Sequence, residues 1–144
     1  MRYWLESHDA SGLLAAAIRA VEGPGACLSL EGDLSSYALW ALVDASDQPI
    51  APLVRTTQDP LLGFVVIPLS PQNVAVVLRA TSRPPKLGED SPIVHVQIAV
   101  GPRLVFGAYD NFHPDCTFID GMPYEALVEM QRHGVIGKFE PAVD

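Results

Sequence analysis

The segment YDNFHPDC, residues 109–116, holds most of the side chains in this sequence that could do chemistry. It contains carboxylates, an amide, an imidazole and a thiol. In a tight turn with Pro114 at its second position, His113 and Cys116 have Cα atoms within about 7 Å of each other. An imidazolium beside a thiol makes a nucleophile. The same spacing also suits a hydrogen-bonded type I turn with Phe112 buried and no reactivity, so both interpretations stay open.

A second candidate site depends on how residues 93–100 pair with residues 103–110. The dipeptide GP between them suits a type II′ hairpin turn. A regular register then puts His95 on the same face as Asp110, within reach of a hydrogen bond. Together with His113 these residues could form an acid–base or metal cluster. The core face predicted by this register carries Val94, Val96, Ile98, Val100, Val105, Gly107 and Tyr109.

The charge distribution favours a binding surface over a catalytic site. The chain has a net charge of −8, with most of its acids near its two ends. If these acids converge after folding, they create a field that attracts a cationic partner. A charge that only keeps the protein soluble is the alternative interpretation. The predicted binding residues are Tyr109, Asp110, Asn111, Phe112, His113, Asp115, Asp120, Glu125 and Glu129.

Several function classes are disfavoured by what the sequence lacks. It has no glycine-rich nucleotide loop, no H-E-x-x-H, no C-x-x-C and no G-x-S-x-G, so we expect no cofactor and no metal. A protein this acidic is a poor nucleic-acid binder, and no apolar run is long enough for a membrane span. Cys27 and Cys116 have no metal-type spacing and are expected to be reduced. We therefore expect a cytoplasmic protein and favour a binding protein over an enzyme.

The pattern of elements predicts one domain, residues 1–144, of the α+β class. We expect a mainly antiparallel sheet with two or three helices packed on one face. Ser70 followed by Pro71 is typical of a helix start, although the valines that follow also suit a strand. The predicted helices cover 10–22, 71–80 and 123–133, and the predicted strands cover 2–6, 26–33, 63–69, 93–100 and 103–110.

Residues 37–43 are apolar on every side, so either a buried strand or a buried helix fits them. The turn-forming residues that follow favour a hairpin with residues 50–56, in which Pro52 would mark a sheet edge. Trp4 and Trp40 are expected to be core or partly buried anchors. The tail 137–144 is expected to be short and frayed.

In size and charge the chain is similar to bacterial immunity and antitoxin-type proteins, although it shares no specific motif with them. The resemblance implies an inhibitor that blocks a basic partner protein, such as a nuclease toxin, by surface complementarity. One alternative is a small hydrolase-like enzyme that uses Cys116 or the cluster of His95, Asp110 and His113. The other is a homo-oligomeric accessory subunit joined through an edge strand near Pro52. We expect a monomer or a homodimer.

Overall fold

The protein forms one seven-stranded antiparallel sheet with three helices, and the computed structural model describes residues 1–143. This confirms the predicted α+β class. The elements are β1 (Arg2–Ser7), α1 (Ala10–Val21), β2 (Ala26–Gly32), β3 (Gly63–Pro68), α2 (Pro71–Thr81), β4 (Ile93–Val100), β5 (Arg103–Ala108), a 3₁₀ turn η1 (Pro114–Cys116), β6 (Thr117–Asp120), α3 (Tyr124–Arg132) and β7 (Ile136–Pro141).

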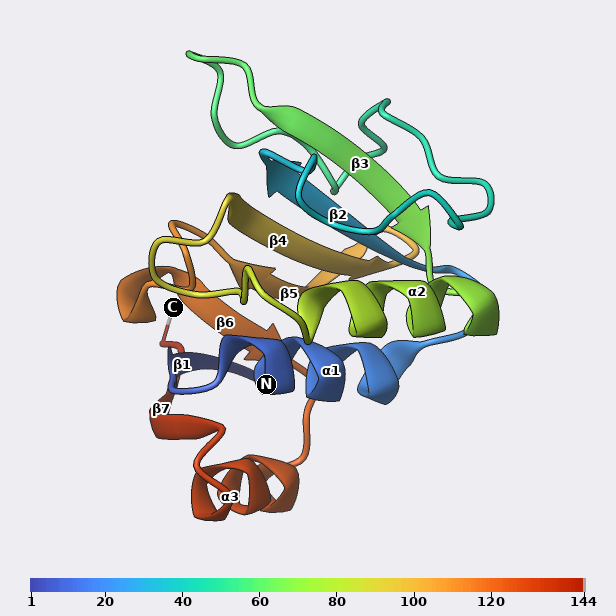
Figure 1. Ribbon diagram of the computed structural model, residues 1–144. Helices are drawn as coiled ribbons and strands as arrows, with labels where there is room; N and C mark the ends of the chain where they lie inside the picture. Colours follow the sequence, from blue (N-terminus) through green and yellow to red (C-terminus); the bar gives the residue numbers. More distant parts are fainter. Residues whose placement is uncertain (144) are drawn as a thin grey trace.

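The strands follow the order β3-β2-β4-β5-β6-β1-β7, and every neighbouring pair is antiparallel. The sheet twists strongly from β3 at one edge to β7 at the other (Figure 1). The first strand of the chain lies between the last two, because β1 pairs with both β6 and β7. None of the helices in residues 1–143 has the length and apolar character needed to cross a membrane.

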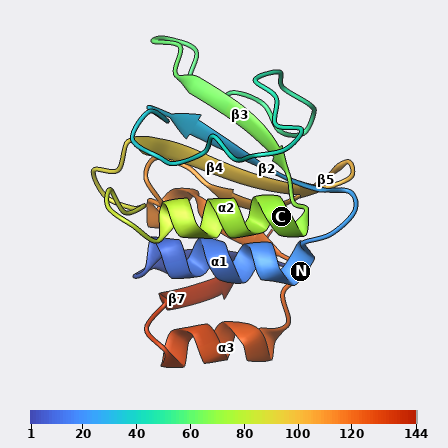
Figure 2. The same cartoon turned by 45° about the vertical axis from the view of Figure 1, so that its right-hand side comes forward.

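The helices line up along one face of the sheet, in the order α2, α1, α3 (Figure 2). The predicted start of α2 is confirmed, because the Ser70 hydroxyl accepts the Asn73 N–H. At the start of α1 the Asp9 carboxylate accepts the Gly12 N–H. Both side chains satisfy an N–H group that has no partner inside the helix. Residues of all three helices share one hydrophobic core with the sheet, including Leu13, Leu14, Ile18, Val77 and Leu127.

The predicted hairpin of residues 37–43 and 50–56 is wrong. Residues 33–62 form a long loop that contains only isolated bridges. Backbone groups of this loop find hydrogen-bond partners other than a strand. The buried Asn73 side chain is one of them, because its amide bonds both the N–H and the C=O of Val43. Pro52 therefore lies in a loop and marks no sheet edge. Trp40 is not an anchor either, since its side chain is 87% exposed.

The predicted register between β4 and β5 is wrong beyond the turn. A β-bulge shifts the pairing between Ile98 and Ala99, so that Ile98 lies opposite Phe106. One extra residue on one strand reverses the faces of everything that follows. The core face therefore carries Phe106 and Ala108, while Gly107 and Tyr109 lie on the face of His95 and Gln97.

The predicted frayed tail is also wrong, because residues 136–141 form β7 and pair with β1. A left-handed glycine cap ends α3 before this strand. Gly134 has a φ of 75°, and the Val135 N–H bonds the Met130 carbonyl at 2.9 Å, as a Schellman closure requires. Phe139 of β7 packs edge-on against Tyr3, at 5.8 Å between ring centroids.

Candidate functional site

A left-handed turn follows β5 and gives the segment 109–116 its shape. Asp110, Asn111 and Phe112 have φ values of 52°, 58° and 61°. Each left-handed residue other than glycine costs about 1–2 kcal/mol, less for Asp and Asn than for an aromatic residue. Three in a row persist only where the surrounding contacts hold them in place, and such strain is common at functional sites.

Asn111 provides most of those contacts. Its side-chain Nδ2 lies 3.0 Å from the Gly88 carbonyl, 2.9 Å from that of Ser91 and 3.2 Å from that of Ile93. Phe112 is only 5% exposed and packs beside Phe106, with ring centroids 6.3 Å apart. Its burial, predicted from the sequence, is confirmed. The left-handed turn is thus fastened both to the loop before β4 and to the core.

The left-handed turn forms one wall of a hollow of about 630 Å³, which we call the turn hollow. The loop 87–90 and the start of α1 form its other walls. Its carboxylates are those of Glu89, Asp90 and Asp110, and its histidines are His8 and His113. Within residues 1–143 no cation of the chain forms an ion pair with any of the three carboxylates. An electronegative hollow therefore faces solvent.

A second hollow, of about 500 Å³, lies on the other side of η1, and Pro114 lines both. We call it the Trp4 hollow. The exposed face of the Trp4 indole lines it, while the ring packs edge-on against Phe118 at 6.0 Å. The hollow also contains the carboxylates of Glu6, Asp115 and Glu140, with Lys138 as its cation. Asp115 therefore lines the Trp4 hollow and not the turn hollow.

A buried polar network lies behind the left-handed turn, on the sheet face opposite the helices. Glu31 is 2% exposed, and its carboxylate accepts the N–H groups of Thr56 at 2.8 Å and Thr57 at 3.1 Å. His95 pairs with Glu31 across β2 and β4, and its Nε2 lies 2.8 Å from the Thr57 hydroxyl. Its Nδ1 accepts the Asp110 N–H at 3.1 Å. His95 therefore joins the long loop 33–62 to the left-handed turn.

These bonds fix the protonation of His95. Because Nδ1 accepts a hydrogen bond, the proton of the neutral ring is on Nε2 and is donated to Thr57. Burial lowers the pKa of His95, against the smaller raising effects of Glu31 and Asp110. In this state the imidazole cannot take a proton from Thr57, so the network acts as a structural clamp and not as a nucleophile with its base.

The predicted cluster of His95, Asp110 and His113 is brought together only in part. His95 contacts the backbone of Asp110 and not its carboxylate, and the ring of His113 caps η1 by accepting the Asp115 N–H at 3.1 Å. Across residues 1–143, no three His, Cys, Asp or Glu side chains are arranged to hold a metal ion.

The turn that joins His113 to Cys116 is as predicted, because the Cys116 N–H bonds the His113 carbonyl at 2.9 Å. Within residues 1–143 the His113 imidazole contacts Asp115 and forms no hydrogen bond with the Cys116 thiol. Cys116 is half-buried and carries a free thiol, as does Cys27. The use of Cys116 as a nucleophile stays a prediction, without a positioned base beside it.

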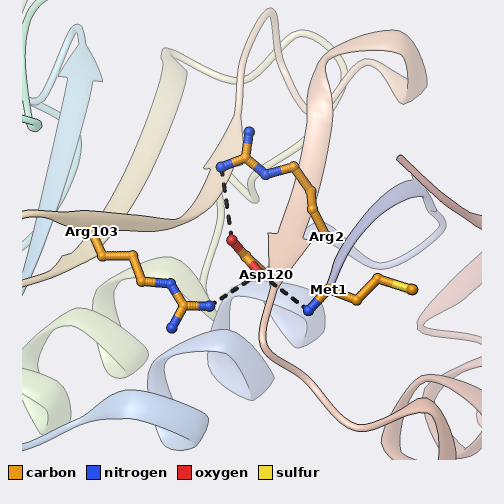
Figure 3. A network of polar contacts seen from close by, with 4 residues as sticks. All are labelled: Met1, Arg2, Arg103 and Asp120. Carbon is orange, nitrogen blue, oxygen red and sulfur yellow. Dashed lines mark hydrogen bonds and ion pairs between the residues drawn. The ribbon is translucent and has the colours of Figure 1, made fainter. Parts of the chain in front are cut away.

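Three of the predicted binding acids lie away from the turn hollow. Asp120 ends β6, and because β6 runs away from the left-handed turn, it lies at the opposite end of the strand. It forms ion pairs with the Met1 amino group at 3.6 Å, with Arg2 at 4.0 Å and with Arg103 at 3.1 Å (Figure 3). Glu129 of α3 pairs with Arg132 and His133, and Glu125 lies in the first turn of the same helix.

The sequence reasoning missed Glu89 and Asp90, which lie in an exposed loop with no periodic pattern. It also missed Glu31, whose partners are in the long loop. Of these, only Glu31 left a signal: a charged residue within an otherwise apolar strand is a candidate for burial with a partner.

No protein family, no curated protein and no solved structure matches this chain.

Proposed function

We propose that this is a binding protein that receives a cationic side chain of a basic partner protein in the turn hollow. The observation that carries the proposal is the set of three carboxylates, Glu89, Asp90 and Asp110, which line one hollow and form no ion pair with any cation of residues 1–143. Carboxylates left without partners around a concavity attract an arginine or a lysine. The rigid left-handed turn holds Asp110 in place before the partner arrives, which lowers the entropy cost of binding.

Such a protein would act by blocking its partner's basic surface, in the manner of a bacterial immunity or antitoxin-type inhibitor in the cytoplasm. The net charge of −8 supports this role, because it accelerates the encounter with a basic protein. Asp115 and Glu6 of the adjacent Trp4 hollow extend the acidic surface past η1. The exposed Trp4 indole offers a second contact that a cation can stack on.

The test uses a fluorescein-labelled tetra-arginine peptide as the cationic probe and measures its binding by anisotropy. The site variant is Asp90→Asn with Asp110→Asn. Asparagine tolerates the left-handed conformations of both positions, at φ values of 64° and 52°. The control variant is Glu22→Gln with Glu125→Gln, which changes the net charge equally but lies outside the hollow.

We expect the site variant to bind the peptide about tenfold more weakly, since each exposed charge pair contributes up to about 1 kcal/mol. The control should change binding by less than twofold. If both variants weaken binding equally, only net charge attracts the peptide, and the turn hollow is not the binding site. Binding should also weaken as salt is raised.

A further inference from the structure

A second surface of the protein has the opposite charge. The outer sides of α1 and α2 enclose a groove of about 510 Å³, which we call the helix groove. Three cations line it: Arg19 from α1, Arg79 from α2 and Lys86 from the loop that follows α2. Within residues 1–143, none of the three forms an ion pair with an acid of the chain.

This clustering is unexpected in a chain with 17 acids and nine bases. Three of the six other arginines and lysines have acidic partners: Arg2 and Arg103 pair with Asp120, and Arg132 pairs with Glu129. Within residues 1–143, four of the six cations without an ion pair therefore lie on α1, on α2 or in the loop that follows α2: Arg19, Arg79, Arg83 and Lys86. The groove contains one acid, Asp9, whose carboxylate caps α1 by accepting the Gly12 N–H at 3.0 Å.

The helix groove has rigid walls. The helices run antiparallel there, and the Ser11 hydroxyl of α1 donates to the Thr81 carbonyl at the end of α2 at 2.6 Å. Arg19 and Arg79 are both in the last turns of their helices, so their Cα positions are fixed by the fold. Its volume lies within the roughly 300–1,000 Å³ of small-molecule sites, so it is larger than one inorganic ion needs.

We propose that the helix groove binds a small phosphate-bearing anion through Arg19, Arg79 and Lys86. Guanidinium groups donate pairs of parallel hydrogen bonds to phosphate oxygens, and a lysine adds a mobile point charge. Three cations match a pyrophosphate or a nucleotide better than a single carboxylate. A long nucleic acid fits less well, because the acidic turn hollow begins just beyond Lys86, at Leu87.

Isothermal titration calorimetry with pyrophosphate tests the proposal at low salt, with ADP and adenosine as further probes. The variants are Arg19→Gln and Arg79→Gln. Arg83→Gln is the matched control, because Arg83 is exposed, forms no ion pair within residues 1–143 and lies close to the end of α2, but does not line the helix groove. All three positions are exposed, and thermal unfolding midpoints within about 1 °C of the wild type would show that the fold is intact.

We expect saturable binding of pyrophosphate at one site, about tenfold weaker in each groove variant and changed less than twofold in Arg83→Gln. ADP binding with no binding of adenosine would show that the phosphates carry the recognition, whereas equal binding of both would overturn it. No saturable binding of pyrophosphate, or an equal loss in all three variants, would also overturn the proposal. These outcomes do not depend on the tetra-arginine experiment, because the two hollows share no residue.

Discussion

Asn111 provides the sharpest test of how the left-handed turn is held. Its side-chain amide has two N–H groups, and they are directed at the carbonyls of Gly88, Ser91 and Ile93. Each such bond contributes about 1 kcal/mol, and each buried carbonyl left without a donor costs about 1–3 kcal/mol. The left-handed backbone, with φ of 58°, contributes separately, because asparagine and glycine tolerate it better than most residues.

Two substitutions at this position separate these contributions. Asn111→Gly relaxes the backbone but removes the side-chain bonds, so we expect a loss of about 1–2 kcal/mol in the free energy of unfolding. Asn111→Asp keeps a side chain that tolerates the left-handed region but directs a carboxylate at carbonyl oxygens. It should cost about 3–5 kcal/mol, from two lost bonds and from the repulsion between a half-buried carboxylate and the carbonyl oxygens it faces.

Urea unfolding followed by far-ultraviolet circular dichroism measures both losses, with Asp115→Asn as a control in the same segment. Asp115 is exposed, so the control should stay within about 0.5 kcal/mol of the wild type. Our reasoning is refuted if Asn111→Asp is as stable as the wild type, or if it is more stable than Asn111→Gly. Either result would mean that the three carbonyls do not depend on this amide.

Three further predictions concern the sheet face opposite the helices. Glu31→Ala should lower the free energy of unfolding by about 2–4 kcal/mol, because it leaves the N–H groups of Thr56 and Thr57 without an acceptor. An unchanged urea unfolding curve would contradict this. Burial lowers the pKa of His95 in the folded state, so below about pH 6.5 the unfolded chain binds more protons. The free energy of unfolding should therefore fall as the pH drops below that value, and His95→Gln should show a flatter pH profile; identical profiles would refute this. Leu53→Ala should cost about 2–4 kcal/mol, because Leu53 is 2% exposed, whereas Leu61→Ala, at a position 65% exposed, should cost less than about 0.5 kcal/mol in thermal or urea unfolding.

The elements that could be predicted from the sequence are those whose signals are local. The start of α2 is marked by Ser70 and Pro71, and this capping signal prevailed over the strand preference of its valines. The end of α3 was equally readable, because Gly134 can adopt the left-handed conformation that the cap requires. Each of these signals involves residues within one or two helical turns of one another, so their meaning does not depend on the rest of the fold.

The features that could not be predicted depend on distant partners. Residues 37–43 and 50–56 resemble strands locally, but the side chains that bond backbone groups of the loop, Glu31 and Asn73, come from other elements. The bulge between β4 and β5 has no glycine to mark it, and it moved Tyr109 to the face of His95. The candidate site was predicted in part. The left-handed turn lies in the predicted segment 109–116, but Glu89 and Asp90, which complete the turn hollow, lie in a loop whose sequence has no hydrophobic periodicity.

The position of β1 between β6 and β7 has a consequence for synthesis. β1 is synthesised before the other strands of the sheet, yet its neighbours β6 and β7, residues 117–120 and 136–141, are synthesised after all of them. The part of the sheet formed by β2, β3 and β4 can therefore form while β1, which carries Tyr3 and Leu5, still has no partner strand. Because pairing of distant segments is slow, we expect the part of the sheet that contains β1, β6 and β7 to form last, and its strands to be exposed longest during folding.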